Sequence, residues 1–287
     1  MANGSGTAVR CVVVAVDGSE QSLRAVDWGA DEAARRRVPL RLVHACLWER
    51  YERDTEDEDE PLSVRNEVRQ LIAAALERAA ERQPAVETAT EVIPEDAVPA
   101  LLGLGGLAPL LVLGHRGRGG FEGLLLGSVG LRVVGRAEYP VVLVRGEPSE
   151  PTGRLVLAVD ENERATAAAA GFAVAEARVR GAELDLVHAW QRESFRSGGS
   201  ILMTDVTAEE LAGRLVAAVP LPDADGLTVH RRARRGRAAK VLLEAAAGAD
   251  LVVLAAGRHA HGGLQLGSVS HAVLHHAPCP VAVVPVG

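Results

Sequence analysis

The stretch VVVAVDGSE, Val12 to Glu20, returns later in the chain as LVLAVDENE, Leu155 to Glu163. Each copy is a run of aliphatic residues that ends in an aspartate and a polar cluster typical of a helix start. Three further pairs repeat in the same order and at similar spacing: LRLVHACLW with LDLVHAWQR, LLLGSVGLRVV with LQLGSVSHAVL, and YPVVLV with CPVAVV. The chain is therefore a tandem duplication.

Within the first half, apolar runs rich in valine and leucine alternate with helical patterns. The expected strands are Val9–Val16, Leu40–Leu47, Val86–Ile93, Pro109–Leu113 and Val141–Val144, and the expected helices are Ser19–Arg37, Pro61–Arg82, Glu95–Leu107 and Ser128–Arg136. Continuous apolar strands between helices indicate a parallel sheet that is buried on both faces. We therefore predict an α/β fold of two tandem, five-stranded, doubly wound (Rossmann-like) domains.

The segment GEPSEPTG, Gly146 to Gly153, is a short linker rich in proline and glycine. It predicts domains at residues 1–147 and 153–287. The glycine-rich segment LGLGGL predicts a short or irregular third helix, because each glycine costs about 1 kcal/mol relative to alanine. The closing strands Pro140–Val144 and Pro280–Val284 are candidate sheet edges, which tend to be paired. We expect the two halves to form a pseudo-twofold dimer through them; a homodimer of whole chains stays open.

The composition excludes several classes of protein. The chain has 287 residues and a net charge of −7, which argues against a nucleic-acid partner. Its longest mostly apolar run, Leu101–Gly114, is shorter than the roughly 18 residues required to span a bilayer, so we expect no membrane partner. Cys11, Cys46 and Cys279 are too widely spaced for a disulfide framework, and no apolar leader opens the sequence. We therefore expect a cytoplasmic protein.

The stretch LGHRGRGGFEGLLLGSVG, Leu113 to Gly130, has the character of a phosphate-binding loop. Glycines let the backbone approach a bulky anion, and Gly127-Ser128 opens a helix whose N–H groups and dipole favour negative charge. Arg116 and Arg118 lie between them, where a triphosphate needs cations. In an open parallel sheet, ligands bind beyond the carboxyl ends of the strands, where this loop is expected.

The spacing Gly114-x2-Gly117-x9-Gly127-Ser128 resembles the nucleotide-binding signature of the universal stress protein family, in its ATP-binding branch. The resemblance extends over both halves and includes the aspartate after strand 1 and the VHA of strand 2. It implies ATP, with or without Mg²⁺, as the cofactor. It also implies that Asp17 contacts the adenine region and that the backbone of Ala15 and Ala45 lines the base pocket.

The resemblance assigns the remaining residues of the first half to the sugar and phosphates. Leu113, Gly114 and Gly117 are expected along the ribose and phosphates. Gly127, Ser128 and Val129 are expected to hold the phosphates from the helix N-terminus.

The second half departs from this pattern, because Ala255 stands where the first glycine is expected and the loop is about one residue shorter. The counterparts that remain are Ala158, Asp160, Ala189, Gly257, Gly267, Ser268 and Val269. We therefore expect an intact first site and a degenerate second one. Arg258, His259 and His261 are candidates to face phosphates there.

Several of these residues also have simpler interpretations. Asp17 and Asp160 could be ordinary helix caps. His44 and His188 are expected to be packed, hydrogen-bonded histidines rather than catalytic bases, because no partner constellation accompanies them. The pair His271 and His275 has zinc-binding spacing, but no third ligand is in register, so we expect an exposed or interface surface. The acidic run from 49 to 61 is expected to be a solvated loop.

The sequence has binding elements but lacks familiar catalytic motifs. A P-loop is excluded, because the only lysine, Lys240, follows an alanine. We therefore expect an ATP-binding regulatory module in the stress response, with an adenine nucleotide and an unidentified protein as partners, and no catalytic or metal-ligating residue. The alternatives are a nucleotide-independent interaction scaffold and a slow ATPase or adenylyl-transfer enzyme.

Overall fold

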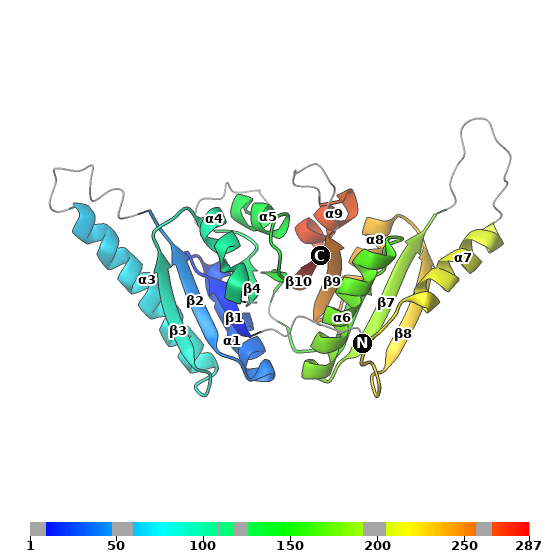
Figure 1. Ribbon diagram of the computed structural model, residues 1–287, viewed down its shortest axis with the longest axis horizontal. Helices are drawn as coiled ribbons and strands as arrows, with labels where there is room; N and C mark the ends of the chain where they lie inside the picture. The colour runs from blue at the N-terminus through cyan, green and yellow to red at the C-terminus, as the bar shows by residue number, and fades with distance from the viewer. Residues whose placement is uncertain are drawn as a thin grey trace. The chain divides into compact units, whose positions relative to one another are not determined.

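The computed structural model describes residues 10–47, 60–107, 109–117, 126–147, 149–191, 205–256 and 266–286. The chain divides into two compact units, Met1–Arg145 and Gly146–Gly287 (Figure 1). In each unit, parallel strands alternate with helices along the chain, and the predicted α/β class is confirmed.

The first unit has its strands in the order β3-β2-β1-β4-β5, all parallel. Its elements are β1 (Cys11–Ala15), α1 (Glu20–Arg36), β2 (Leu40–Ala45), α3 (Glu60–Arg82), β3 (Thr88–Ile93), α4 (Ala97–Leu102), the 3-10 helix η1 (Gly103–Leu107), β4 (Pro109–Gly114), α5 (Ser128–Val134) and β5 (Val141–Val144). The chain moves outward from β1 to β3 and then crosses back to β4, so the strand order reverses between β1 and β4. The predicted irregular third helix is confirmed as α4 followed by η1.

The second unit repeats this order as β8-β7-β6-β9-β10. Its elements are β6 (Arg154–Ala158), α6 (Glu163–Arg180), β7 (Glu183–Trp190), α7 (Asp205–Ala218), β8 (Val229–Arg235), α8 (Ala238–Ala246), β9 (Leu251–Ala256), α9 (Ser268–His276) and β10 (Val281–Pro285). The outermost strand of this sheet is β8, the counterpart of β3.

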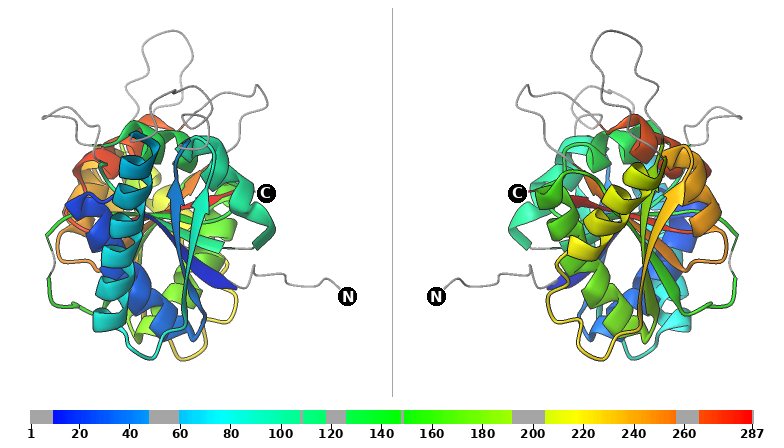
Figure 2. Two further views of the ribbon diagram at one scale, coloured as in Figure 1. Left: turned by 90° about the vertical axis from the view of Figure 1, so that its left-hand side faces the viewer. Right: turned by 90° about the vertical axis from the view of Figure 1, so that its right-hand side faces the viewer.

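The core of each unit is built from the central strands. Residues 12–14 of β1 and 155–157 of β6 are completely buried, which requires cover on both faces of the sheet. In the first unit, α1 packs against α3, and α4 packs against α5. Figure 2 shows these two pairs on opposite sides of the first unit's strands. Burial on both faces explains why the strands are continuous apolar runs rather than alternating ones.

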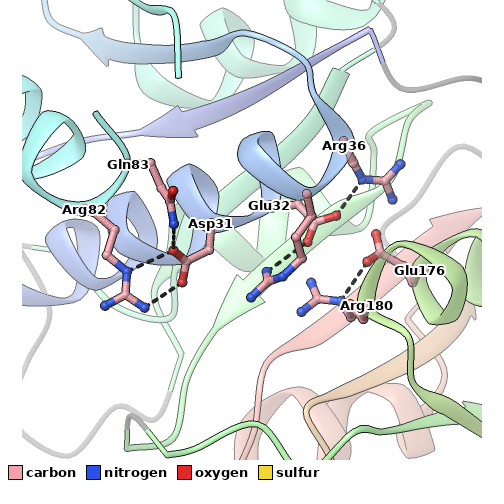
Figure 3. Close-up of polar contacts among 8 residues, drawn as sticks. Asp31, Glu32, Arg36, Arg82, Gln83, Glu176 and Arg180 are labelled. Atoms are coloured by element: carbon pink, nitrogen blue, oxygen red, sulfur yellow. Dashed lines mark hydrogen bonds and ion pairs between the residues drawn. The ribbon is translucent and has the colours of Figure 1, made fainter. Parts of the chain in front are cut away.

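Each unit has a buried glutamate near the carboxyl end of its first helix (Figure 3). The Glu32 carboxylate is fully buried on α1 and lies 2.5 Å from the Nε of Arg36. Glu176 occupies the same place on α6 and lies 3.0 Å from the Nε of Arg180. A buried carboxylate needs such a partner, because removing a charge from water is costly.

An ion pair joins the two outer strands of each unit, with its charges reversed between the units. In the first unit, the Nε of Arg41 on β2 lies 3.1 Å from a carboxylate oxygen of Glu91 on β3. At the corresponding positions of the second unit, Asp185 on β7 lies 3.5 Å from Arg232 on β8. The strand registers, Val43 beside Glu91 and Val187 beside Arg232, show that the positions are equivalent.

The C-cap of α1 offers a stability test. Arg37 adopts a left-handed conformation with φ of 55°, whereas the second unit has Gly181 there with φ of 61°. Because a side chain is strained in that region, Arg37→Gly is expected to stabilise the chain by about 1 kcal/mol in urea unfolding. Gly181→Ala is the matched control and should destabilise it. A destabilising Arg37→Gly would contradict the strain argument.

Candidate functional site

The predicted site residues of the first unit meet at one edge of its sheet. The strands are parallel and β1 lies between β2 and β4, so their carboxyl ends are adjacent. Ala15 ends β1, Ala45 ends β2, and Leu113 and Gly114 end β4. This edge contains the point between β1 and β4 where the strand order reverses, which is where ligands bind in open α/β sheets.

Asp17 organises the turn between β1 and α1. Its Oδ1 accepts hydrogen bonds from the Ser19 backbone N–H at 3.0 Å and from the Ser19 hydroxyl at 2.6 Å. The N-cap of α1 is Ser19 itself, whose hydroxyl oxygen accepts from the backbone N–H of Ser22. The interpretation of Asp17 as the helix cap is therefore wrong.

The glycine loop returns to Asp17 at Gly117. A Cβ atom built on Gly117 would lie 2.3 Å from Oδ2 of Asp17, a separation that real side chains do not adopt. A side chain at this position would therefore require the Asp17 carboxylate to move away from the loop. The contact joins two parts of the predicted site that are far apart in the sequence.

Gly114 has a packing role. A Cβ atom there would lie 2.6 Å from the carbonyl oxygen of Gln21, in the first turn of α1. The absence of a side chain therefore lets α1 approach the end of β4 closely. The second unit has Ala255 at this position, so this close approach belongs to the first unit.

Gly127 differs from these two glycines, because nothing in the described structure requires it. Its φ of −71° and ψ of 148° suit any residue, and a Cβ atom added there would have its nearest neighbour 3.6 Å away. Its N–H donates to the carbonyl oxygen of His115 at 2.8 Å, which ties the loop to the start of α5. Ser128 and Val129 follow at the exposed first turn of that helix.

Arginine side chains make this edge electropositive. The Nε of Arg116, in the loop between Gly114 and Gly117, is buried and has no hydrogen-bond partner among the described residues. A buried guanidinium nitrogen without an acceptor is costly in a folded protein. The Nε–H of Arg116 is therefore a donor that an anionic ligand could satisfy.

His115 is a site residue whose place in the sequence gave no indication of a role. Burial is the main reason that the pKa of His115 lies below its ordinary value, although the Nδ1 contact with the carbonyl oxygen of Val144, at 3.2 Å, acts in the opposite direction. Arg145, Arg116 and Arg24 lower the pKa further through their charges. Three guanidinium groups therefore act on one histidine: that of its neighbour Arg116, and those of Arg24 and Arg145 from other parts of the first unit.

The two strand-end histidines are held by the backbone. The Nδ1 of His44 lies 2.7 Å from the carbonyl oxygen of Val16, and the Nδ1 of His188 lies 2.9 Å from that of Val159. Each histidine therefore links the end of its own strand, β2 or β7, to the residue that follows the adjacent strand, β1 or β6. These contacts agree with their interpretation as packed, hydrogen-bonded residues.

The second unit has a similar arrangement at the carboxyl edge of its sheet. Asp160 accepts from the backbone N–H of Asn162 at 2.8 Å, and Asn162 caps α6, so the cap interpretation of Asp160 is also wrong. Ala158 ends β6, Ala189 lies near the end of β7, and Gly267, Ser268 and Val269 form the start of α9. A Cβ atom on Gly267 would meet nothing within 4 Å.

Some predicted residues fall outside the described ranges. They are Arg118, Gly257, Arg258, His259, His261 and most of the acidic run from 49 to 61. Within the described ranges, no three or more His, Cys, Asp or Glu side chains are grouped to hold a metal ion. His271 and His275 stack on α9 with ring centroids 4.3 Å apart. The helices of the described segments include none that is both long and apolar enough to cross a bilayer.

Comparisons with known proteins give the family. The model of the universal stress protein family matches residues 9–145 and again residues 151–285. Two universal stress proteins of Mycobacterium tuberculosis strain H37Rv are 35% and 32% identical to the chain, and the matches cover 95% of this chain and 96% and 94% of the relatives. A crystal structure of a universal stress protein from Archaeoglobus fulgidus superposes with a TM-score of 0.68 at 17% identity, covering 96% of each chain. The chain is thus a member of the universal stress protein family, with two copies of the family domain.

Proposed function

We propose that this protein is a regulatory module that binds ATP at the carboxyl edge of the first unit's sheet. The observation that carries the proposal is the buried Nε of Arg116, which has no acceptor among the described residues. The arginines around His115 add positive charge at the same edge. A polyphosphate would supply the missing acceptor and offset that charge.

The geometry supports a direction for the nucleotide. Ala15, Asp17 and Ala45 lie at the ends of β1 and β2, on the side where the base is proposed. The phosphates are proposed at Gly117, Gly127 and the first turn of α5. The backbone angles at Gly127 suit any residue and an added Cβ would make only ordinary contacts at 3.6 Å, so the fold alone does not explain a glycine there, which supports this placement. Free N–H groups at Ser128 and Val129 would then donate to phosphate oxygens.

The proposed role is binding rather than turnover. Nucleotide occupancy would change the surface around the glycine loop and so the affinity for a protein partner. Phosphate release under multiple turnover that is lost with Gly127→Val would favour the slow ATPase instead.

We propose the second unit as a weaker site. Asp160, Gly267 and Ser268 keep the arrangement of their counterparts, but Ala256 follows Ala255 where the first unit has the arginine-surrounded His115. The second unit therefore lacks the titratable ring that the first unit has at this position. Titration calorimetry is expected to give about one ATP per chain at concentrations near the dissociation constant of the first site.

A thermal shift experiment tests the proposal directly. ATP at about 100 times its dissociation constant is expected to add about 2.7 kcal/mol to the free energy of unfolding. Mass spectrometry of the protein as purified should also detect bound adenine nucleotide. If ATP, ADP and AMP leave the unfolding transition unchanged, the nucleotide-independent scaffold replaces this proposal.

Binding is expected to depend on pH through His115. Its pKa is low in the free protein, so bound phosphates should raise that pKa by favouring the charged ring. Proton uptake then accompanies binding, and affinity should rise as the pH falls from about 8 to about 6. Calorimetry in buffers of different ionisation enthalpy measures the uptake. His115→Gln should abolish it; proton release on binding would contradict the placement of the phosphates.

A further inference from the structure

The outermost strand of the second unit, β8, carries an unusual concentration of arginine. Four of its seven residues are arginine, namely Arg231, Arg232, Arg234 and Arg235, and Arg237 follows as the N-cap of α8. The first unit has TATEVI in β3 at the equivalent place, without a basic residue. The duplicated fold therefore does not require this charge, since the same strand position is built without it.

Part of the charge on β8 is not compensated within the described structure. Arg232 is paired with Asp185, and the guanidinium carbon of Arg235 lies 5.8 Å from the centre of the Trp190 ring. Arg231, Arg234 and Arg237 have no carboxylate within ion-pair distance among the described residues. Arg231 and Arg237 are also exposed, so a negatively charged group can reach them.

The backbone of β8 is open along one side. The strand ends the sheet of its unit, and within the described ranges it pairs with β7 alone (Figure 1). The carbonyl of Thr228 accepts from Leu184, and the N–H of Gly236 donates to Trp190, so even-numbered residues of this strand face β7. The N–H and C=O groups of the odd-numbered residues 229, 231, 233 and 235 therefore point to the open edge.

From these observations we propose that the β8 edge binds an extended, carboxylate-rich segment of a protein partner as an added strand. The partner's backbone pairs with the open N–H and C=O groups, as in other cases of β-augmentation. Successive side chains of an added strand alternate between the two faces of the sheet, and so do the arginines of β8. Carboxylates on either face therefore meet a guanidinium group.

The positive charge on β8 also explains which segments the open edge is not expected to bind. Arginine along an edge strand opposes pairing with another basic or apolar strand, a common protection against aggregation. An acidic segment is the exception, because the same arginines attract its carboxylates. The phosphates of a nucleic acid would be attracted by the arginines, but a nucleic acid cannot pair with the row of backbone N–H and C=O groups. The aromatic ring beside β8, that of Trp190, is also buried and so is not available for base stacking.

Fluorescence anisotropy with the full chain tests the charge requirement. The probe is a labelled peptide of about ten residues that alternates glutamate with threonine. Binding at low ionic strength should weaken with added salt, and Arg231→Glu with Arg234→Glu should weaken it at least about tenfold. The control Arg69→Glu with Arg136→Glu makes the same charge change in the first unit and should leave binding within about twofold.

A second comparison tests the added strand. Ala233→Pro removes an N–H that faces the open edge, so the fold should tolerate it while binding falls at least about tenfold. Val92→Pro makes the corresponding change on β3 and should leave binding unaffected. A probe N-methylated at alternate residues keeps its charge and should also bind at least about tenfold more weakly. No binding to the unmodified chain, or an equal loss in the Arg69 and Arg136 control, overturns the proposal.

A third arm distinguishes the polyanion alternative. A single-stranded RNA oligonucleotide of matching charge should bind more weakly than the peptide. If the RNA binds as tightly and Ala233→Pro leaves both ligands unaffected, β8 is a general polyanion surface and the added-strand proposal is wrong. None of these outcomes depends on the nucleotide site, since nucleotide-free chain is used throughout.

Discussion

Valine in place of Gly127 is expected to remove most ATP binding while leaving the fold of the first unit intact. The backbone dihedral angles at Gly127 suit valine, and its Cβ would have ordinary contacts at 3.6 Å. The added side chain instead fills the space proposed for the phosphates at the start of α5. We expect the dissociation constant measured by titration calorimetry to rise at least about 100-fold, or about 2.7 kcal/mol.

The two units supply the control for this substitution. Gly267→Val makes the same change at the start of α9, where a Cβ would meet none of the described atoms within 4 Å, and it should alter ATP binding much less. Gly117→Val is also expected to lower binding but is a poorer test, because its side chain would collide with Asp17. Equal losses from Gly127→Val and Gly267→Val would show that the ranking of the two sites is wrong.

Replacing Glu32 by alanine is expected to destabilise the chain by about 3–5 kcal/mol. The carboxylate is fully buried and lies 2.5 Å from the Nε of Arg36, whose side chain is itself only 10% exposed. Removing the Glu32 carboxylate takes the 2.5 Å partner from a mostly buried guanidinium group, and breaking a buried pair in this way costs far more than the net value of the pair. Urea unfolding followed by circular dichroism measures the change.

The same helix contains a matched control for this effect. Glu20 and Arg24 form an ion pair of the same spacing, with the atoms 3.7 Å apart, but the Glu20 side chain is 58% exposed. Water screens that pair, so Glu20→Ala should cost less than about 1 kcal/mol. Glu176→Ala should resemble Glu32→Ala, because Glu176 is equally buried beside Arg180. Similar costs for Glu20→Ala and Glu32→Ala would contradict the burial argument.

Local sequence patterns predict the helices and strands of this protein well. The expected helix Ser19–Arg37 differs from α1, Glu20–Arg36, only in the two capping residues, because a serine and a basic last turn mark helix ends. The expected strand Leu40–Leu47 is two residues longer than β2, since the apolar run continues past the last paired residue, Ala45. Strand ends depend on the pairing partner, which a single run of residues does not contain.

The candidate site was predictable only in part, for a similar reason. The motif spacing identifies Gly114, Gly117 and Gly127, but it does not show that they serve different purposes. That distinction depends on contacts with Gln21 and Asp17, which come from another segment of the chain. Two of the three arginines that lower the pKa of His115, Arg24 and Arg145, likewise come from segments that only the fold brings together.

The reversed ion pairs between the outer strands bear on how a duplicated chain folds. Two similar halves can exchange strands during folding, a common failure of repeat proteins. If β3 paired with β7, Glu91 would face Asp185, and if β8 paired with β2, Arg232 would face Arg41. Both exchanged pairings place like charges together and are penalised. The reversed charges therefore favour the pairing of each outer strand with the inner strand of its own half over pairing with the other half.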